Sequence, residues 1–519
     1  MVTGLRLLPF GDRGVLVELG SLTDVLTVQA RLTADVPDGV IDVVPAARTV
    51  LVHVNPRVLP LAAARAWIER ASGAPVAAGA RSVDEVVVPI RYDGDDLAET
   101  ARMLETSPDA LVAAHAGAVW TVAFTGFAPG FGYLVSEQWP FDVPRLSSPR
   151  TRVPAGAVGL AGVFSGAYPR ETPGGWRLIG RTDAPLFDPA AATPVLLTPG
   201  ATVRFALERA RAAVAVGVEA AASAHVTPAD AAFTVVEPGL FATVQDQGRP
   251  GHAAEGVAGG GAADRGALRT ANRLLGNDED AAGVEVTLGG FRAVADVDLW
   301  VAVTGAWGPV EIDGARVDPY AAHPWPAGSA LHVDWFAHGA RAYVAVRGGV
   351  AAAELFGSRS TDTLAGLGPR ALQAGDRLGR ADAARAPIPP EDLHPWSPVV
   401  DDPVVFELAP GPRAGWFDAE AHRVLYEATW VVTAQADRVG IRLDGPALTR
   451  AVSMELPSEG MLPGAVQVPP GGEPVVFGPD APVTGGYPVI AVVVDRDRLG
   501  QLRPGARVRF RHARARPDR

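Results

Sequence analysis

Residues 173–180 read PGGWRLIG and lead on to PGATVRF at 199–205. Near the end of the chain, TGGYPVIA at 484–491 leads on to PGARVRF at 504–510. A paired-glycine turn, an aromatic residue, a short strand and a Pro-Gly turn before an alternating strand describe one β-rich unit built twice. The repeat predicts a pseudo-symmetric body with a ligand site in a cleft between its halves. The alternative is chance recurrence of turn motifs in a Gly- and Pro-rich chain.

The length and composition predict a globular protein of several domains. At 519 residues the chain is long for a single core, so two to four domains are expected. A hydrophobic content of 48% with 20% charged residues is typical of a soluble protein. Because no apolar run is long enough to span a membrane and the start lacks a signal-peptide pattern, we expect a cytoplasmic location.

The chain contains no cysteine and no lysine, so all 46 basic residues are arginine. The lack of cysteine excludes disulfides, thiolate nucleophiles and zinc–thiolate sites. The lack of lysine excludes a phosphate-binding loop with its lysine, Schiff-base chemistry, a biotinylated lysine and a Ser-Ser-Lys amidase centre. A GC-rich genome that has replaced surface lysine by arginine would explain the composition, and the exclusions hold in either case.

The net charge of −12 argues against nonspecific binding to nucleic acid or to anionic lipid. The basic residues at 511–516 form a short terminal run. Such a run is more typical of a solvated chain end than of a nucleic-acid-binding arm.

Pattern changes along the chain predict its domains. A small α+β domain is expected at 1–78 and a β-barrel at 79–206, followed by an Ala-rich linker at 207–230. Two further β-rich regions at 231–385 and 403–511 flank a Pro-rich linker at 386–402, and 512–519 is a basic tail. Within the third region, 264–275 is expected to be a helix that starts at Asp264 and stops at Gly276.

The densest motif is FTGFAPGFGYL at 124–134. Three glycines and a proline among four aromatic residues predict a stiff loop that holds backbone N–H groups and aromatic faces against a ligand. Downstream, Arg145, Arg150 and Arg181 each lie beside a turn, where a guanidinium can bind a carboxylate or phosphate. In the alternative interpretation, the aromatic residues pack in a core and the arginines face solvent.

Further motifs make the chain recognisable. Residues 238–249 read PGLFATVQDQGR, and 357–362 read GSRSTD. From about residue 5 to 205 the chain resembles the allophanate hydrolase subunit 1 family, marked by the aromatic loop and by PGGW with IGRT. From about 233 to 510 it resembles the subunit 2 family, marked by these two motifs, by the DRVGIRL of 437–443 and by TGGYP. Two small departures are Ala263, where the family usually has Met, and Gly132, where Pro is common.

The resemblance implies a fusion of the B and C subunits of prokaryotic ATP-dependent 5-oxoprolinase, which are also similar to the carboxyltransferase region of urea carboxylase. It implies a mainly β fold with α+β parts: cyclophilin-like barrels in both halves and a small N-terminal α+β domain. It further implies ATP and Mg²⁺, a separate partner subunit of the lactam-utilisation type, a small cyclic amide as substrate and possible homo-oligomers. With no lysine, this chain carries no biotin.

Opening an unstrained lactam with ATP calls for positive charge near the phosphates, a carboxylate for Mg²⁺ or proton transfer, and donors for the substrate. The catalytic candidates are His115, Asp246, Asp264, Arg359 and Asp362. The binding candidates are Phe127, Pro129, Gly130, Phe131, Tyr133, Arg145, Arg150, Gly174, Gly175, Trp176, Arg181, Gln245, Arg249, Asn272, Ser358, Arg438, Gln467, Gly485, Gly486 and Tyr487. Two of the catalytic candidates have structural alternatives, since Asp264 fits a helix N-cap and a lone His115 is often structural. The metal-binding residues stay unassigned.

Three functions therefore stand side by side. The first is ATP-dependent cleavage of 5-oxoproline to glutamate together with a partner subunit. The second is a urea-carboxylase-like carboxyltransferase module, related to urea amidolyase, that works with biotin carried on another chain. The third is a regulatory binding protein, since related subunits resemble a histidine-kinase inhibitor and its antagonist.

Overall fold

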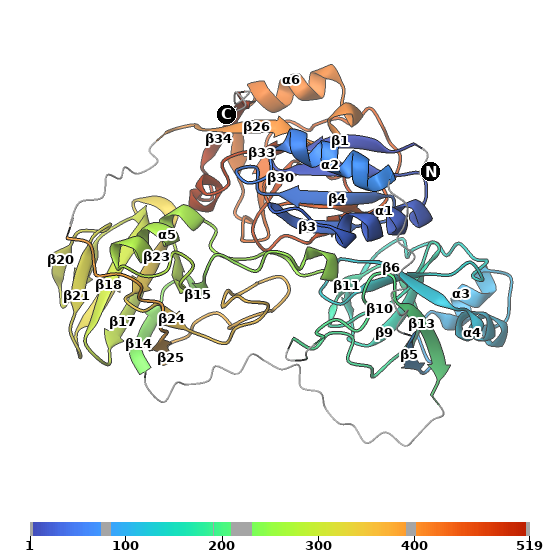
Figure 1. The fold of residues 1–519 in the computed structure, drawn as a ribbon, viewed down its shortest axis with the longest axis horizontal. Helices are drawn as coiled ribbons and strands as arrows, with labels where there is room; N and C mark the ends of the chain where they lie inside the picture. Colours follow the sequence, from blue (N-terminus) through green and yellow to red (C-terminus); the bar gives the residue numbers. More distant parts are fainter. Residues whose placement is uncertain are drawn as a thin grey trace.

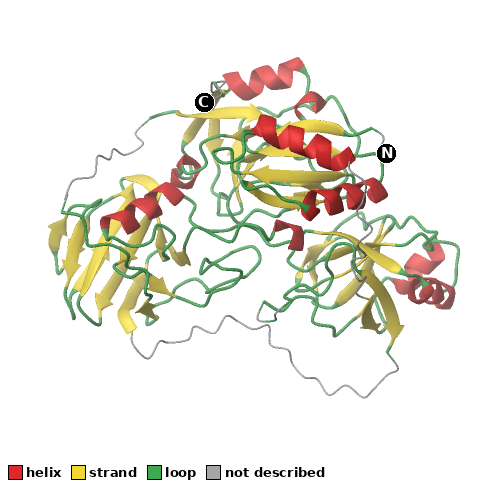
Figure 2. Cartoon of the chain, in the orientation of Figure 1, coloured by secondary structure: helices red, strands yellow, loops and turns green. Residues whose placement is uncertain are grey.

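The computed structural model describes residues 4–73, 85–189, 191, 193–208, 231–390 and 401–514. Strands predominate over helices, which are few (Figure 2). The chain forms three lobes around a common centre (Figure 1). They are the first barrel (residues 85–208), the middle lobe (231–390), and a third lobe in which the N-terminal sheet (4–73) packs on the C-terminal barrel (401–514). This confirms the predicted mainly β fold with barrels in both halves and a small N-terminal α+β domain.

The N-terminal sheet is antiparallel, in the order β1-β2-β4-β3, with two helices against one face. Its elements are β1 (Arg6–Phe10), β2 (Gly14–Glu18), α1 (Leu22–Ala34), β3 (Val40–Pro45), β4 (Thr49–Val54) and α2 (Leu61–Gly73). Side chains alternate along a strand, so Val15 and Val17 of β2 pack with the helices while Leu16 points to the opposite face.

That opposite face packs on the C-terminal barrel and not on the barrel that follows it in sequence. The shared core consists of Phe10, Leu16, Val44 and Leu51 with Met461, Leu462, Ala465, Phe477, Ala481, Val489 and Val492. A buried charge cluster closes the edge of this contact: Arg413 Nη1 donates to Glu18 at 2.6 Å, and Arg413 Nε donates to Glu459 at 3.0 Å. The first and last segments of the chain therefore form one folded unit.

The first barrel contains seven main strands, in the order β12-β9-β10-β7-β6-β13-β5. Its elements are β5 (Glu85–Ile90), α3 (Leu97–Met103), α4 (Pro108–Gly117), β6 (Trp120–Thr125), β7 (Gly132–Val135), β8 (Arg150–Val153), β9 (Ala157–Ala161), β10 (Phe164–Ala167), β11 (Thr172–Gly174), β12 (Arg177–Arg181) and β13 (Thr202–Leu207). The backbones of Arg91 and Arg181 exchange hydrogen bonds of 2.9 and 2.8 Å, which join β5 to β12 and close the barrel.

The C-terminal barrel is closed, in the order β26-β33-β30-β31-β28-β27-β34. Its elements are β26 (Val404–Pro410), η2 (Ala414–Trp416), α6 (Ala419–Glu427), β27 (Trp430–Val432), β28 (Gly440–Asp444), β29 (Glu459–Gly460), β30 (Ala465–Gln467), β31 (Val475–Phe477), β32 (Thr484–Gly485), β33 (Val489–Val493), η3 (Arg498–Gln501) and β34 (Arg507–His512).

The two barrels have the same strand order, which accounts for the sequence repeat. β13 pairs in parallel with β5, and β34 pairs in parallel with β26. The helix before β6 and the helix before β27 end in the same way: the Trp120 indole donates to the His115 carbonyl, and the Trp430 indole donates to the Leu425 carbonyl. His115 and Leu425 therefore occupy equivalent positions in the two copies.

The middle lobe places a seven-stranded and a five-stranded sheet around one apolar core. Its elements are β14 (Ala231–Pro238), β15 (Phe241–Gln245), η1 (Ala253–Glu255), α5 (Arg265–Leu274), β16 (Gly283–Thr287), β17 (Phe291–Ala295), β18 (Leu299–Trp307), β19 (Val310–Ile312), β20 (Ala315–Val317), β21 (Ala322–Trp325), β22 (Ala330–Val333), β23 (His338–Val346), β24 (Val350–Ala351) and β25 (Arg377–Arg380). Two long connections reach from it toward the first barrel (Figure 1). They are arm A (residues 246–263) and arm B (352–376).

The predicted helix at 264–275 is α5. Asp264 is its N-cap, accepting a hydrogen bond of 2.9 Å from the Ala267 N–H, and Gly276 follows it with φ +65°. Most of the predicted linkers, residues 209–230 and 391–400, lie outside the described residues. Within the described residues, none of the helices combines the length and apolar character needed to cross a membrane.

Candidate functional site

All three lobes meet at one junction, which is built from loops. The first barrel contributes the loops after β6 and β10, and the C-terminal barrel contributes the equivalent loops after β27 and β31. Arms A and B lie between these loops. Gly130 N–H donates to the Glu255 carbonyl at 3.2 Å, and Gly260 N–H donates to the Pro479 carbonyl at 3.2 Å. The two barrels therefore meet at the junction both directly, through Phe127 and Thr484, and through the arms of the middle lobe.

Asp246, at the end of β15, ties arm A to arm B. Its Oδ1 accepts hydrogen bonds from the Gly248 N–H at 2.8 Å and the Ser358 hydroxyl at 2.6 Å, and its Oδ2 accepts one from the Arg359 N–H at 2.5 Å. Both oxygens are thereby used within the protein. Asp246 positions Ser358 and Arg359, and the structure brings these three predicted residues together.

Arg438 lies at the centre of a fully buried ion cluster. Its guanidinium binds both oxygens of Asp480, at 2.9 and 2.8 Å, and Glu285 Oε1 at 2.6 Å. Burial opposes these charges, but Asp480 and Glu285 together raise the pKa of Arg438, and Arg438 with Arg341 holds the pKa of Glu285 below its usual range. The cluster joins the middle lobe to the C-terminal barrel.

Arg249 and Gln245 are buried, and each has side-chain polar atoms without a hydrogen-bond partner among the described residues. Arg249 Nη2 donates to the carbonyl and hydroxyl of Ser360, whereas its Nε and Nη1 have no hydrogen-bond partner among the described residues. Burial lowers the pKa of Arg249, against the attraction of Asp362. The Gln245 amide nitrogen donates to Thr243 and to the Thr361 carbonyl, while its oxygen has no partner within the described ranges. Unsatisfied buried polar atoms cost free energy unless a ligand or water binds them.

Asp362, on arm B, is only 1% exposed. Its Oδ1 accepts from the Leu364 and Ala365 N–H groups, while Oδ2 has no partner in the part of the chain that the structure describes. Burial and the nearby charge of Asp480 raise the pKa of Asp362 to about 6. A carboxyl in this state can exchange a proton near neutral pH.

The aromatic loop has a different environment. Phe131, Tyr133, Tyr168 and Trp176 form one buried aromatic group, with ring centroids 5.0–5.4 Å apart. Burial raises the pKa of Tyr133 to about 12, and Arg145 opposes this. Phe127 is 40% exposed with φ +67°, and its N–H donates to Thr484 at 3.3 Å. Most of the loop is thus core packing, and Phe127 with Pro129 reaches the junction.

Several predicted residues lie away from the junction and have local partners. Arg150 pairs with Asp96 at 2.7 Å, Arg181 pairs with Asp93 at 2.6 Å, and Asn272 donates to the Ala281 carbonyl at 2.8 Å. Asp264 caps α5 and accepts from Gln501 at 2.7 Å; burial raises its pKa to about 7.

The paired-glycine turns belong to the two barrels. Gly174 and Gly175 precede Trp176, and a Cβ on Gly174 would lie 2.6 Å from the Tyr168 hydroxyl. Gly485 and Gly486 precede the exposed Tyr487, whose carbonyl accepts from Gln467 at 3.2 Å. Thr484, which contacts Phe127, belongs to the second of these turns. The junction encloses a small hollow bounded by Phe127, Arg170, Asp362 and Asp480, and none of the turn glycines lines it.

His115 is fully buried in the core of the first barrel. Its Nδ1 lies 2.7 Å from the Tyr92 hydroxyl and its Nε2 lies 2.8 Å from the Ser165 hydroxyl. Burial lowers the pKa of His115 to about 3, so the ring is neutral at pH 7. Its neighbours Trp120, Trp139 and Phe205 are buried too, and the structure therefore places His115 apart from the other catalytic candidates.

Because the folded state keeps His115 neutral, its contribution to stability is complete above pH 6.5 and is lost as pH falls toward 3. His115→Leu, which copies Leu425, should cost about 1–3 kcal/mol at pH 7 by leaving Tyr92 and Ser165 unpaired. That cost should shrink by about 2 kcal/mol at pH 5. Denaturant unfolding at the two pH values measures the difference, and a cost independent of pH would contradict the neutral buried ring.

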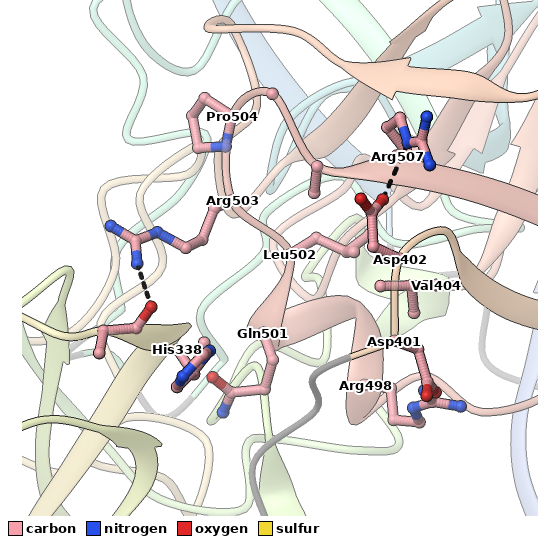
Figure 3. A pocket seen from close by; sticks show the side chains of 14 residues that line it. His338, Asp401, Asp402, Val404, Arg498, Gln501, Leu502, Arg503, Pro504 and Arg507 are labelled. Atoms are coloured by element: carbon pink, nitrogen blue, oxygen red, sulfur yellow. Dashed lines mark hydrogen bonds and ion pairs between the residues drawn. The ribbon is translucent and has the colours of Figure 1, made fainter.

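A second, larger hollow of about 770 Å³ lies between β23 and the C-terminal barrel (Figure 3). Its charged side chains bind one another: Arg507 pairs with Asp402 at 2.9 Å and Arg498 with Asp401 at 3.2 Å, while Arg503 donates to the Ala337 carbonyl. None of the residues predicted from sequence lines it.

Sequence reasoning missed three residues of the junction: Arg170, Glu285 and Asp480. β10 and β31 are equivalent strands of the two barrels. Arg170 and Asp480 each lie three residues after the end of their strand, directly after a proline. Extending the repeat comparison into these loops would have found the pair. Glu285 lies within a strand, and no local pattern marks it.

The comparisons with known proteins agree with this architecture. Residues 5–197 match the model "Carboxyltransferase domain, subdomain C and D", and 255–512 match "Carboxyltransferase domain, subdomain A and B". The C subunit of 5-oxoprolinase from Escherichia coli K12 is 36% identical over 283 residues, which are 53% of this chain and 89% of that protein. The B subunit from E. coli O157:H7 is 46% identical over 123 residues, or 23% of this chain and 56% of that protein.

The chain is also similar to a urea amidolyase and to a protein of known crystal structure. The urea amidolyase of Lachancea kluyveri is 29% identical over 54% of this chain, but the match covers only 17% of that protein. The crystal structure of the protein TTHA0988 superimposes with a TM-score of 0.84 at 35% identity, over 96% of this chain and 99% of that one. The chain therefore belongs to the carboxyltransferase-domain family that includes the C subunit of 5-oxoprolinase, and it joins a B-type and a C-type region in one polypeptide.

Proposed function

We propose that this chain is the fused B and C component of an ATP-dependent 5-oxoprolinase, which cleaves 5-oxoproline to glutamate together with a separate partner subunit. The main support is the junction of the three lobes, where buried arginines and carboxylates carry unsatisfied hydrogen-bonding atoms. Relatives named as the B and C subunits of 5-oxoprolinase support the same reaction.

The chemistry of the junction suits a lactam. Cleavage of an unstrained amide needs an energy source, which ATP supplies, and donors for the charge that develops on the carbonyl oxygen. The free donors of Arg249 and the Nε of Arg359 can meet phosphate or this oxygen, and Asp362 can exchange a proton. The lactam offers an N–H and a C=O, which match the free acceptor of Gln245 and the arginine donors.

The described residues do not offer a site built for Mg²⁺. They contain no group of three or more His, Asp or Glu side chains that could hold a metal ion, and both oxygens of Asp246 are already used. Magnesium commonly binds through substrate phosphates with few protein ligands. Within this proposal it would arrive with ATP.

The second candidate is a carboxyltransferase of the urea carboxylase type. It is favoured by the match to a urea amidolyase over 54% of this chain. The absence of lysine means that biotin would have to be carried on another chain.

One assay separates the candidates: glutamate formation from 5-oxoproline and ATP, with and without the lactam-utilisation-type partner. We expect glutamate and phosphate in equal amounts when both proteins are present. Carboxyl transfer from carboxybiotin without any glutamate would favour the second candidate. Inhibition of a histidine kinase without any turnover would favour a regulatory binding protein.

Arg359→Ala should lower kcat/KM for 5-oxoproline by about 10²–10³, the usual cost of one lost donor to a developing charge. The matched control is Arg370→Ala, on the same arm, which removes a half-exposed arginine that pairs with Asp376 outside the junction. Steady-state kinetics on both variants checks the prediction. Wild-type kcat/KM in Arg359→Ala, with an unchanged circular dichroism spectrum, would place the chemistry elsewhere.

A further inference from the structure

The hollow at the junction has room for about one water molecule. All three lobes line it: Phe127 and Arg170 from the first barrel, Asp362 and Leu364 from arm B, and Asp480 from the C-terminal barrel. Asp362 Oδ2 is the buried carboxylate atom here that lacks a hydrogen-bond partner among the described residues.

Arg170 and Asp480, one from each barrel, both bind the segment that carries Asp362. Arg170 Nη2 donates to the Leu364 carbonyl, while Asp480 Oδ2 accepts from the Thr363 N–H at 2.9 Å and from its hydroxyl at 2.8 Å. The two residues occupy equivalent positions in the two barrels and carry opposite charge. The duplication thus supplies a matched pair of supports for the turn at 362–365.

Charged side chains of arm A, the first barrel and the C-terminal barrel all act on the carboxyl group of Asp362. Asp480 raises its pKa, while Arg249 of arm A and Arg438 of the C-terminal barrel lower it. Arg170 of the first barrel attracts the carboxylate, and its own Nε is buried without a partner in the described ranges. A water between Asp362 Oδ2 and Arg170 Nε would satisfy both atoms.

We infer that this hollow holds the water that opens the ring, that Asp362 is the residue that takes the proton of this water, and that Arg170 and Asp480 are positioning residues. The inference rests on the proposed function. ATP first transfers its terminal phosphoryl group to the ring carbonyl oxygen, and ADP leaves. The water oxygen then bonds to the ring carbonyl carbon and one of its protons passes to Asp362. That proton moves to the ring nitrogen as the C–N bond breaks, which leaves a primary amine and an acyl phosphate. A second water cleaves the acyl phosphate to the carboxyl group and phosphate.

Asp362→Asn keeps the shape of the side chain but cannot take the proton. Assayed with the partner subunit, it should lower kcat by about 10²–10⁴. Asp318→Asn, an exposed change in the same lobe, is the matched control and should behave as wild type. If Asp362→Asn keeps the wild-type kcat and pH profile while folded, Asp362 is not the base.

Asp480→Asn tests the positioning role separately. In the wild type, kcat should fall as pH drops below about 6, because the base must be ionised. Without the Asp480 charge, this acid limb should move down by about one pH unit, and kcat at pH 8 should fall because the asparagine holds the turn at 362–365 less well. An unshifted limb would overturn the role of Asp480.

A high-resolution crystal structure of the chain tests the hollow without any turnover. An ordered water within hydrogen-bond distance of Asp362 Oδ2 and Arg170 Nε is expected, and its absence would overturn the inference. If the wild type forms no glutamate with its partner, the proposed function fails as a whole. If glutamate forms at an equal rate with Asp362→Asn, the inference fails alone.

Discussion

Replacing Arg438 by methionine is expected to destabilise the fold by about 3–5 kcal/mol. The change keeps much of the volume of the side chain but leaves Asp480 as a buried carboxylate without its cation, and Glu285 with Arg341 as its remaining cation. Loss of one partner from a buried pair costs far more than the pair itself contributes. We expect a lower guanidinium midpoint and faster proteolysis in the region where the middle lobe meets the C-terminal barrel.

The control for this experiment is Arg423→Met. Arg423 also forms two ion pairs, with Glu420 and Glu427, but all three side chains are largely exposed. Exposed pairs contribute little, so no clear shift of the midpoint is expected. Equal shifts in the two variants would mean that burial does not decide the outcome. A triple change of Arg438, Asp480 and Glu285 to apolar residues should recover part of the loss.

The second large effect concerns the covalent connection between the halves. If a protease site is placed in the stretch between residues 208 and 231 and is cut, the two fragments should stay together. The N-terminal sheet shares a buried core with the C-terminal barrel, and Arg413 bridges Glu18 and Glu459 across the boundary. Burial of this kind contributes roughly 25 cal/mol per Å² of apolar surface. Size-exclusion chromatography of the cut protein should give one peak that contains both fragments.

Leu51→Asp serves as the separating variant. The side chain lies in the buried core that contains Met461 and Leu462, so a charge there would be buried without a partner. After cutting, the Leu51→Asp protein should elute as two peaks. Before cutting, it should elute as a single peak. An exposed change on the same domain, Arg57→Asp, should leave the cut fragments together. Separation of the unmodified fragments on cutting would show that the shared core alone does not hold the halves.

Local patterns predicted much of the fold. The repeated Pro-Gly turn and the Val-Arg-Phe strand indicated β13 and β34, and both strands close their barrels by parallel pairing. Asp264 and Gly276 set the ends of α5 to within one residue. These features depend on capping, turn geometry and alternation, which act over a few residues and are therefore visible in the sequence.

Long-range packing is what the sequence did not reveal. Leu16 and Leu51 read as strand residues of an N-terminal domain, but their partners at 461 and 462 lie far along the chain. For the same reason Asp480 escaped notice, since its importance comes from Arg438 and from arm B. His115 lies a few residues before the aromatic loop in sequence, yet it is on the buried face of α4, inside the barrel core.

The shared core of the first and last segments also has a consequence for synthesis. On the ribosome, the apolar face formed by Leu16 and Leu51 emerges roughly 400 residues before Met461 and Leu462, which cover it. At typical elongation rates this face waits for about 20–80 s. A growing chain that exposes leucines for so long is a natural client for chaperones, and premature termination would leave a product prone to aggregate.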